Sequence, residues 1–168
     1  MRKIVIGLIG FVLLVLAIQW AVIHYLPDVV YKIATRRIEH KFNVWINAGK
    51  TDASMRRVVM PNPDFVYSAL FYDVTDNNIQ ISGVLPDSTY ASISFYDDRC
   101  QPYCVYNNLD SSRTGKFELN LVKNETSAPH TVHVKTERGV VICRFLKSTD
   151  GSYQQLVPYQ KMLRCEVK

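Results

Sequence analysis

One apolar segment near the amino terminus constrains this chain more than any other feature. Ile4 to Leu26 is a run of 23 residues without an Asp, Glu, Lys or Arg. At about 1.5 Å per helical residue the run reaches roughly 34 Å, enough to cross a hydrocarbon core of about 30 Å. A soluble domain of this size would struggle to surround so long an apolar helix. The segment therefore predicts a transmembrane helix.

The residues that end this segment favour a retained anchor over a secretory signal peptide. A signal peptide has a shorter apolar centre of about 7–15 residues and small residues at its cleavage site. Here Gln19, Trp20, His24 and Tyr25 follow without such a pattern. Trp20 and Tyr25 suit the interface between membrane and water. We expect residues 1–27 to form a cytoplasmic tip and the membrane anchor.

The charges around the span do not decide its orientation. Arg2 and Lys3 precede it, and four basic residues follow it: Lys32, Arg36, Arg37 and Lys41. The cysteines favour export, because all four (Cys100, Cys104, Cys143 and Cys165) lie downstream and an exported domain would use them as disulfides. We therefore expect a single-pass protein of the bacterial inner membrane with its carboxyl-terminal part in the periplasm.

A second, amphipathic helix is expected over residues 28–42, directly after the span. Pro27 suits a first helical turn, and the apolar residues then recur at roughly helical spacing, at Val29, Val30, Ile33, Ile38 and Phe42. Two interpretations are open. The basic residues on its polar face could bind anionic lipid head groups, or the helix could be a solvated stalk.

The distribution of charge argues against nucleic acid as a partner. The formal net charge is +5, but residues 1–41 hold six Lys and Arg against two acidic residues. The remaining residues hold fourteen basic against thirteen acidic residues. A nucleic-acid-binding domain needs a basic face, and the downstream part is nearly neutral.

Downstream of residue 60 the dominant period of the sequence is two, which is typical of strands with one buried face. Phe117, Leu119 and Leu121 alternate with polar residues, and other segments do the same or are rich in aromatic and β-branched residues. Six strands are expected, at about 65–72, 79–85, 91–97, 117–121, 131–135 and 140–146. Leu156, Tyr159, Gln160 and Leu163 can line one side of a short final helix. The fold class is thus mainly β, an antiparallel β-sandwich or jelly-roll-like domain over residues 43–168 with a short C-terminal helix.

The four cysteines allow three pairings. We favour Cys100–Cys104, because Pro102 between them predicts a turn, together with Cys143–Cys165. A zinc site formed by Cys100, Cys104, His130 and His133 is conceivable, but strand residues three positions apart point to opposite faces. We therefore expect no metal and no cofactor.

No catalytic motif stands out in the sequence. There is no G-x-S-x-G, no glycine-rich phosphate loop and no H-E-x-x-H. Asp97 and Asp98 are adjacent carboxylates, but neighbouring strand residues face opposite ways, so we expect a solvated strand end there. An enzyme is therefore the less favoured interpretation.

An ordered set of polar residues carries a family resemblance. A turn with two prolines launches a strand that ends in Asp, then a Pro-Asp turn precedes an aromatic strand that also ends in Asp. The matching residues are Asn62, Asp64, Tyr67, Ser68, Asp73, Pro86, Asp87, Tyr96 and Asp97. This order resembles the bacterial family called domain of unknown function 1254. Gly139 to Arg144 and Gln160-x-x-Leu163 are similar to its closing strand and following helix.

The resemblance implies a β-sandwich of exported or envelope proteins, in a short member that lacks the usual companion domain. If the shared polar positions form a site, the ligand-binding candidates are Asn62, Asp64, Tyr67 and Arg144, with Arg144 pairing Asp64 or holding an anion. Alternatively, Asn62 and Asp64 cap the turn, Tyr67 packs its ring, and Arg144 neutralises a buried carboxylate.

Two functional hypotheses follow. The first is a membrane-anchored binding or accessory module of undefined ligand, whose partners are the lipid bilayer and a membrane-bound protein or small ligand. The second is a small hydrolase-like envelope enzyme with a polar pocket around the same four residues.

Overall fold

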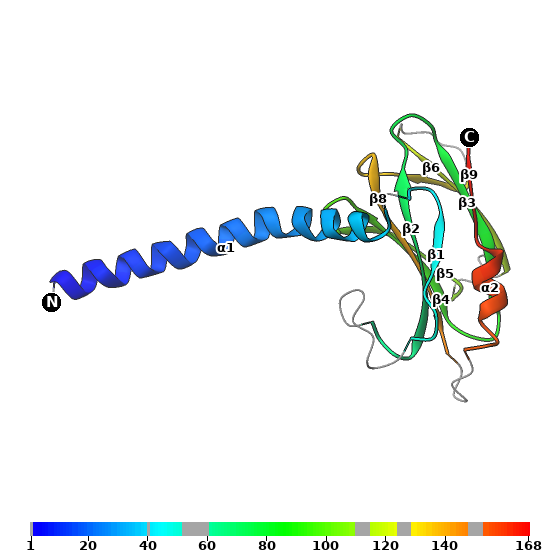
Figure 1. Ribbon diagram of the computed structural model, residues 1–168, viewed down its shortest axis with the longest axis horizontal. Coiled ribbons are helices and arrows are strands. Elements are labelled where there is room, and N and C mark those ends of the chain that lie inside the picture. Colours follow the sequence, from blue (N-terminus) through cyan, green and yellow to red (C-terminus); the bar gives the residue numbers. More distant parts are fainter. Residues whose placement is uncertain (1, 40, 52–60, 110–114, 124–128, 148–152) are drawn as a thin grey trace. The chain divides into compact units, whose positions relative to one another are not determined.

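The computed structural model describes residues 2–39, 41–51, 61–109, 115–123, 129–147 and 153–168. These residues form two compact units, Met1–His40 and Lys41–Lys168. The first unit is a helix and the second is a two-layered β domain, shown in Figure 1.

The first unit contains the helix α1, Arg2–Arg37, and it is long and apolar enough to cross a membrane. No part of its most apolar window is buried, unlike the core helix of a soluble protein, which is mostly buried. An N-terminal signal sequence meets the same criteria of length and composition.

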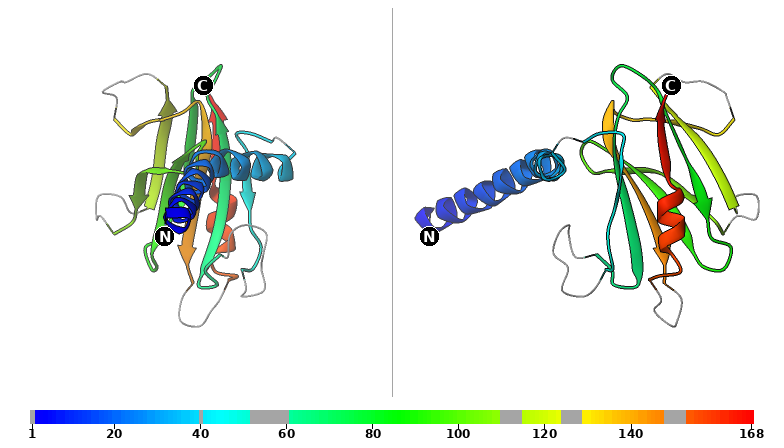
Figure 2. Two further views of the ribbon diagram at one scale, coloured as in Figure 1. Left: turned by 90° about the vertical axis from the view of Figure 1, so that its left-hand side faces the viewer. Right: turned by 45° about the vertical axis from the view of Figure 1, so that its right-hand side comes forward.

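The sequence predicted two helices here, and the structure has one. Pro27 lies inside α1, and the helix continues without a break to Arg37 instead of forming a separate element that ends at residue 42. Proline lacks the N–H group for one helical hydrogen bond, so it bends a helix without necessarily ending it. The two views of Figure 2 show such a bend between the dark-blue and light-blue parts of α1.

Sheet A is the five-stranded antiparallel layer of the β domain. Its strands, in spatial order, are β1 (Trp45–Asn47), β2 (Phe65–Asp73), β8 (Arg138–Leu146), β4 (Ala91–Asp97) and β5 (Pro102–Asn107). Phe42, which was expected to end the predicted second helix, instead lies outside α1 with its ring 5.4 Å from the Arg138 guanidinium carbon.

Sheet B is the second layer. Its order is β7 (Thr131–His133), β6 (Gly115–Val122), β3 (Ile79–Leu85) and β9 (Arg164–Val167), with β7 parallel to β6 and the other pairs antiparallel. The short helix α2, Val157–Met162, precedes β9, and Figure 1 shows it beside β3. The predicted mainly β sandwich with a short C-terminal helix is therefore confirmed.

The core lies between the two sheets and consists of the inward residues of the alternating strands. Its largest fully buried side chains come from five strands and the segment after β2: Tyr72, Phe95, Phe145, Leu70, Ile79, Ile81, Leu85, Ile93, Leu121, Val66, Val74 and Val141. Burying this apolar surface is the main stabilising contribution to such a domain.

The predicted disulfides are absent, since Cys100, Cys104, Cys143 and Cys165 are all free thiols. Cys143 is fully buried on β8 of sheet A, whereas Cys165 is partly buried on β9 of sheet B. The predicted turn through Pro102 is also wrong, because Pro102 begins β5. Cys104 packs from that strand against the core, while Cys100 is exposed in the preceding turn.

Candidate functional site

Three of the four candidate residues meet at the turn that launches β2. The Asn62 side-chain oxygen accepts a hydrogen bond from the Asp64 backbone N–H at 2.9 Å. The Asn62 backbone N–H donates to the Tyr67 hydroxyl at 3.1 Å. These contacts form an Asx turn closed by a tyrosine from the following strand. The turn thus uses Asn62 and Tyr67 as structural groups.

Arg144 lies on β8 beside Tyr67, which is its partner in the β2–β8 register. Its Nε donates to the Ser92 hydroxyl at 2.8 Å, so the side chain links β8 to the neighbouring strand β4 of sheet A. Within the described ranges no ion pair joins Arg144 to Asp64. The predicted Asp64–Arg144 pair is therefore not formed.

Lys147 is the cation that holds the turn, and no sequence motif marks it. Its backbone N–H donates to the Asp64 carbonyl at 2.8 Å. Its ammonium group donates to the carbonyl oxygens of Pro63 and Thr51, the latter at 2.8 Å. A lysine one residue past β8 looks like an ordinary surface charge, because its acceptors are backbone groups that no sequence motif displays.

Asp73 ends β2 and fixes the next turn. Its Oδ1 accepts hydrogen bonds from the Thr75 N–H at 3.0 Å and the Thr75 hydroxyl at 2.6 Å. Its Oδ2 lies 2.7 Å from the Arg138 Nε. Burial alone would raise the pKa of Asp73, but the Thr75 hydrogen bonds and the Arg138 charge outweigh it and hold the pKa below its usual value.

Asp97 fixes the turn that follows β4, as Asp73 fixes the turn after β2, and it is buried rather than solvated. Its residue is only 5% exposed, and its Oδ1 accepts from the backbone N–H groups of Arg99 and Gln101 at 3.0 and 2.8 Å. The expectation of a solvated strand end is wrong for this residue. A carboxylate that accepts two backbone donors compensates for its burial and closes the β4–β5 turn.

Gln160 of α2 is the centre of a buried polar network that sequence reasoning missed. Its Nε2 donates to the Tyr67 carbonyl at 2.9 Å and to the Ser68 hydroxyl at 3.1 Å. Ser68 in turn donates to the side-chain oxygen of Asn47 on β1 at 2.8 Å. The one signal in the sequence is a glutamine among the apolar residues of a short helix. The network joins α2 to the edge of sheet A.

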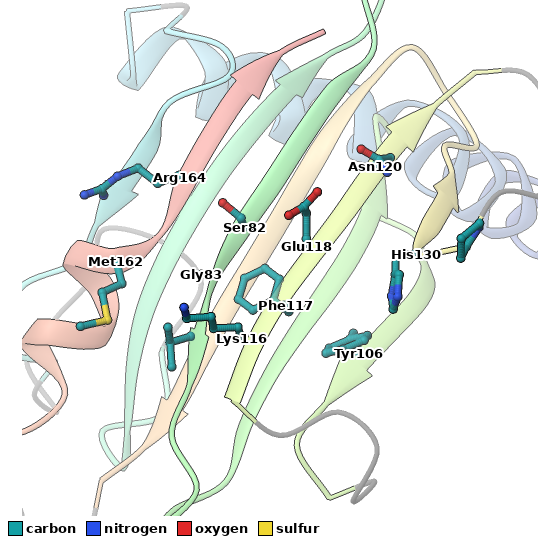
Figure 3. A pocket seen from close by; sticks show the side chains of 12 residues that line it. Ser82, Gly83, Tyr106, Lys116, Phe117, Glu118, Asn120, His130, Met162 and Arg164 are labelled. Atoms are coloured by element: carbon teal, nitrogen blue, oxygen red, sulfur yellow. The ribbon is translucent and has the colours of Figure 1, made fainter.

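A shallow hollow of about 750 Å³ lies on sheet B, and we call it the sheet B hollow. Figure 3 shows its side chains, which come from strands β3, β6 and β9, from the ends of α2 and β5, and from the residues before β7. It is lined by Ser82, Gly83, Val84, Tyr106, Lys116, Phe117, Glu118, Asn120, Pro129, His130, Met162 and Arg164. None of the four sequence-predicted candidates is among them, and none lines a second hollow of about 400 Å³ near Arg138. The four candidates therefore remain a prediction, and their contacts here are those of a turn and a sheet.

The comparisons with known proteins concern the β domain. Residues 42–167 match the family described as Protein of unknown function (DUF1254). None of the curated proteins matches the chain.

Two solved structures are similar in fold. The VPA0106 protein from Vibrio parahaemolyticus has a TM-score of 0.65 and 12% identity, over 88% of this chain and 36% of that one. An uncharacterised protein from Burkholderia cenocepacia has a TM-score of 0.53 and 14% identity, over 90% of this chain and 42% of that one. The chain thus spans less than half the length of either structure.

Proposed function

Because the chain belongs to the DUF1254 family, whose description assigns no activity, we propose a function from the geometry: it is a single-pass inner-membrane protein that holds a β-sandwich binding or accessory module in the periplasm. The lipid bilayer is its first partner. A small ligand or a membrane-bound protein is the second.

The observation that carries the proposal is the contrast between the two units. The apolar side chains of α1 from Ile4 to Leu26 are exposed, whereas the β domain has a complete core of its own. Exposed apolar area on this scale is unfavourable in water and favourable in lipid. A helix of 36 residues extends about 54 Å, so α1 exceeds the thickness of the hydrocarbon core and can hold the domain clear of it.

Binding is supported by the sheet B hollow, which combines polar and apolar side chains on an otherwise solvent-facing sheet. Asn62, Asp64, Tyr67 and Arg144 are retained as a second set of candidate ligand residues. The hydrolase-like alternative gains no specific support from their contacts.

Extraction of membranes tests the anchor. We expect the full chain to stay in the membrane pellet at alkaline pH, where peripheral proteins dissociate, and a variant with Leu13→Arg and Leu14→Arg to be lost from it. The wild-type protein in the soluble fraction, or a mature amino terminus downstream of Leu26, would contradict an anchor.

Carboxyl-terminal fusions test the side of the membrane. Arg2 and Lys3 before the span favour a cytoplasmic amino terminus, but the four basic residues after it favour the reverse, so charge alone does not decide the side. We expect an alkaline phosphatase fusion to be active and a green fluorescent protein fusion to be dark. The reverse result would place the β domain in the cytoplasm.

A further inference from the structure

The edge strands of the two sheets differ in how well they are protected against pairing with a further strand. Sheet A ends in β1 and β5, and sheet B ends in β7 and β9. Proteins protect such edges by keeping the strands short or by placing charges on them. The strands β1 and β7 have three residues each, and β9 has four, of which Arg164 and Glu166 are charged. The strand β5 has six residues and carries no charge.

The hydrogen bonds between β4 and β5 show which backbone groups of β5 point outward. The Asn108 N–H donates to the Ala91 carbonyl oxygen at 3.2 Å, so position 108 faces β4. From Asn107 back to Cys104 the antiparallel pairing with β4 is regular, so even-numbered positions face β4 and odd-numbered positions face away from it. The backbone N–H and C=O groups of Val105 and Asn107 therefore point to the free edge. They have no partner among the residues that the structure describes.

The side chains at this free edge are apolar or uncharged. Val105 is 47% exposed, and Leu109, two residues past the strand, is 76% exposed. Cys104 and Tyr106 pack against the core from the other face of the strand. No Asp, Glu, Lys or Arg occurs between Pro102 and Leu109. Pro102 lies at the start of β5 and protects only that end.

These features select the kind of partner that the free edge fits. Unpaired N–H and C=O groups at every second residue match the backbone of another strand, which is how extended segments add to an exposed sheet edge. An antiparallel pair formed by β5 and the same strand of a second copy is a two-fold symmetric interface. Because β5 has no charged residue, such a pair brings no like charges opposite each other.

We propose that the free edge of β5 pairs with the same edge of a second copy and joins the two copies of sheet A into one continuous sheet. Val105 pairs with Asn107 of the second copy, and Asn107 pairs with Val105 of the second copy. Each such pair exchanges two hydrogen bonds, so this register uses all the outward groups of both residues.

The proposal rests on the proposed function, because it identifies the membrane-bound protein partner as a second copy of the chain. Two paired six-residue strands form a small interface compared with the area of about 1,200–2,000 Å² that stable complexes bury. The membrane anchor compensates for this, because it confines all copies to one surface and raises their local concentration.

The test uses the full chain in lipid vesicles at several ratios of protein to lipid. Copies labelled with a donor or an acceptor dye at Cys100, which is exposed, report association by energy transfer. Hydrogen exchange followed by mass spectrometry reports the pairing itself. We expect the amides of Val105 and Asn107 to be protected in the associated wild type, because both donate across the interface.

Two substitutions of Val105 should disrupt the interface. Val105→Pro removes one outward donor, and proline is tolerated on an edge strand where the N–H faces solvent, so the monomer should fold. Val105→Lys places two positive charges diagonally across the paired strands, about 7–8 Å apart. We expect each variant to weaken association about tenfold or more, and Val105→Lys to leave the Asn107 amide in fast exchange.

Val167→Lys is the matched control, because Val167 is also an exposed valine on an edge strand, β9 of sheet B. It should associate like the wild type, and all three variants should keep the wild-type melting temperature. If Val105→Pro unfolds the domain, Val105→Lys supplies the same test.

Equal energy transfer in the wild type and both Val105 variants would overturn the proposal, because the copies would then meet elsewhere, such as along α1. Absence of energy transfer at every ratio of protein to lipid would also overturn it. Capture of a different protein, abolished by the Val105 variants, would replace the second copy as the partner and overturn it too. Failure of the membrane proposal is separate, because the extraction and fusion experiments do not depend on association.

Discussion

Gly139 of β8 lies so close to β4 that a Cβ atom placed on it would be 2.3 Å from the Tyr96 backbone carbonyl oxygen. The same atom would be 2.4 Å from the Tyr72 hydroxyl, which hydrogen-bonds the Tyr103 hydroxyl at 3.1 Å. Burial raises the pKa of both tyrosines, so the pair is uncharged. Only glycine fits at the point where three strands and this pair meet.

The substitution Gly139→Ala should therefore strongly destabilise the β domain. A backbone carbonyl cannot move away as a side chain can, so we expect the free energy of unfolding to fall by about 3 kcal/mol. Urea denaturation of the full chain in detergent measures it. Gly49→Ala is the control, because a Cβ at position 49 meets nothing within 4 Å. Equal stability of the two variants would contradict the close approach.

Replacing Gln160 by leucine tests the buried network at the edge of sheet A. The change removes the Gln160 donor from the Ser68 hydroxyl and from the Ala48 carbonyl oxygen. The Tyr67 carbonyl oxygen loses one of its two donors and keeps the Ala48 N–H. Unsatisfied buried polar groups should cost about 2–3 kcal/mol of stability. Thermal unfolding followed by circular dichroism measures the effect. Gln154→Leu, at an exposed position, should change stability by less than about 0.5 kcal/mol, and a similar loss in both variants would argue against the network.

The carboxylate of Asp73 should make stability depend on pH in the acid range. Its pKa is lowered in the folded state, so its stabilising contribution is present above the unfolded pKa, near 3.8, and is lost as the pH falls through the lower folded pKa. We expect Asp73→Asn to destabilise the protein at pH 6 and to lose less stability than the wild type on going to pH 3.

Denaturant unfolding at both pH values measures this difference. Asp87→Asn, at an exposed position, serves as the control and should follow the wild-type profile. If Asp73→Asn loses as much stability as the wild type between pH 6 and pH 3, the pH dependence comes from other carboxylates.

The cysteines should differ sharply in reactivity towards a thiol reagent. Cys100 is exposed, and Cys143 is fully buried. Burial and the nearby charges of Asp97 and Asp98 raise the pKa of Cys100, so it should react slowly at pH 7 and faster as the pH rises. Burial and Glu166 raise the pKa of Cys165 to about 11, which makes it slower still.

Titration with Ellman's reagent measures these differences. We expect one thiol, lost in Cys100→Ser, to react first in the native protein, and four thiols to react in denaturant. Fewer than four in denaturant would show that a disulfide forms in the cell.

The sequence predicted the central strands because their residues alternate. The strands β2, β3, β6 and β8 bury mainly one face, so their apolar and polar residues alternate. The strand β4 is buried on nearly all sides, but its apolar residues still alternate with serines. The strands β1 and β9 have three and four residues, too few for a period to appear. The strand β5 was not predicted, because Pro102 indicated a turn. Proline is typical of turns, but it is also tolerated at the start of an edge strand.

The candidate site was harder to predict than the fold. Asn62 was found through the turn it builds and Tyr67 through the family resemblance, and the structure places Tyr67 opposite Arg144 in the β2–β8 pair. Glu118 and Asn120 could not be found in this way, because they occupy outward positions of a strand that look like any solvated face. Their mutual orientation depends on Gln80, about forty residues away in the sequence, and it becomes visible only when the strands pair.

The contact between Trp45 and Arg164 ties the first strand of the β domain to its last. The indole N–H of Trp45 donates to the Arg164 carbonyl at 3.0 Å, and the Asn47 amide reaches the Gln160 carbonyl at 3.5 Å. Tension applied through the membrane helix would reach β1 first and pass directly to the carboxyl-terminal segment. These hydrogen bonds to β1 can form only after the carboxyl-terminal segment has been synthesised. Removal of that segment would therefore weaken the domain at β1, the strand that follows the membrane helix.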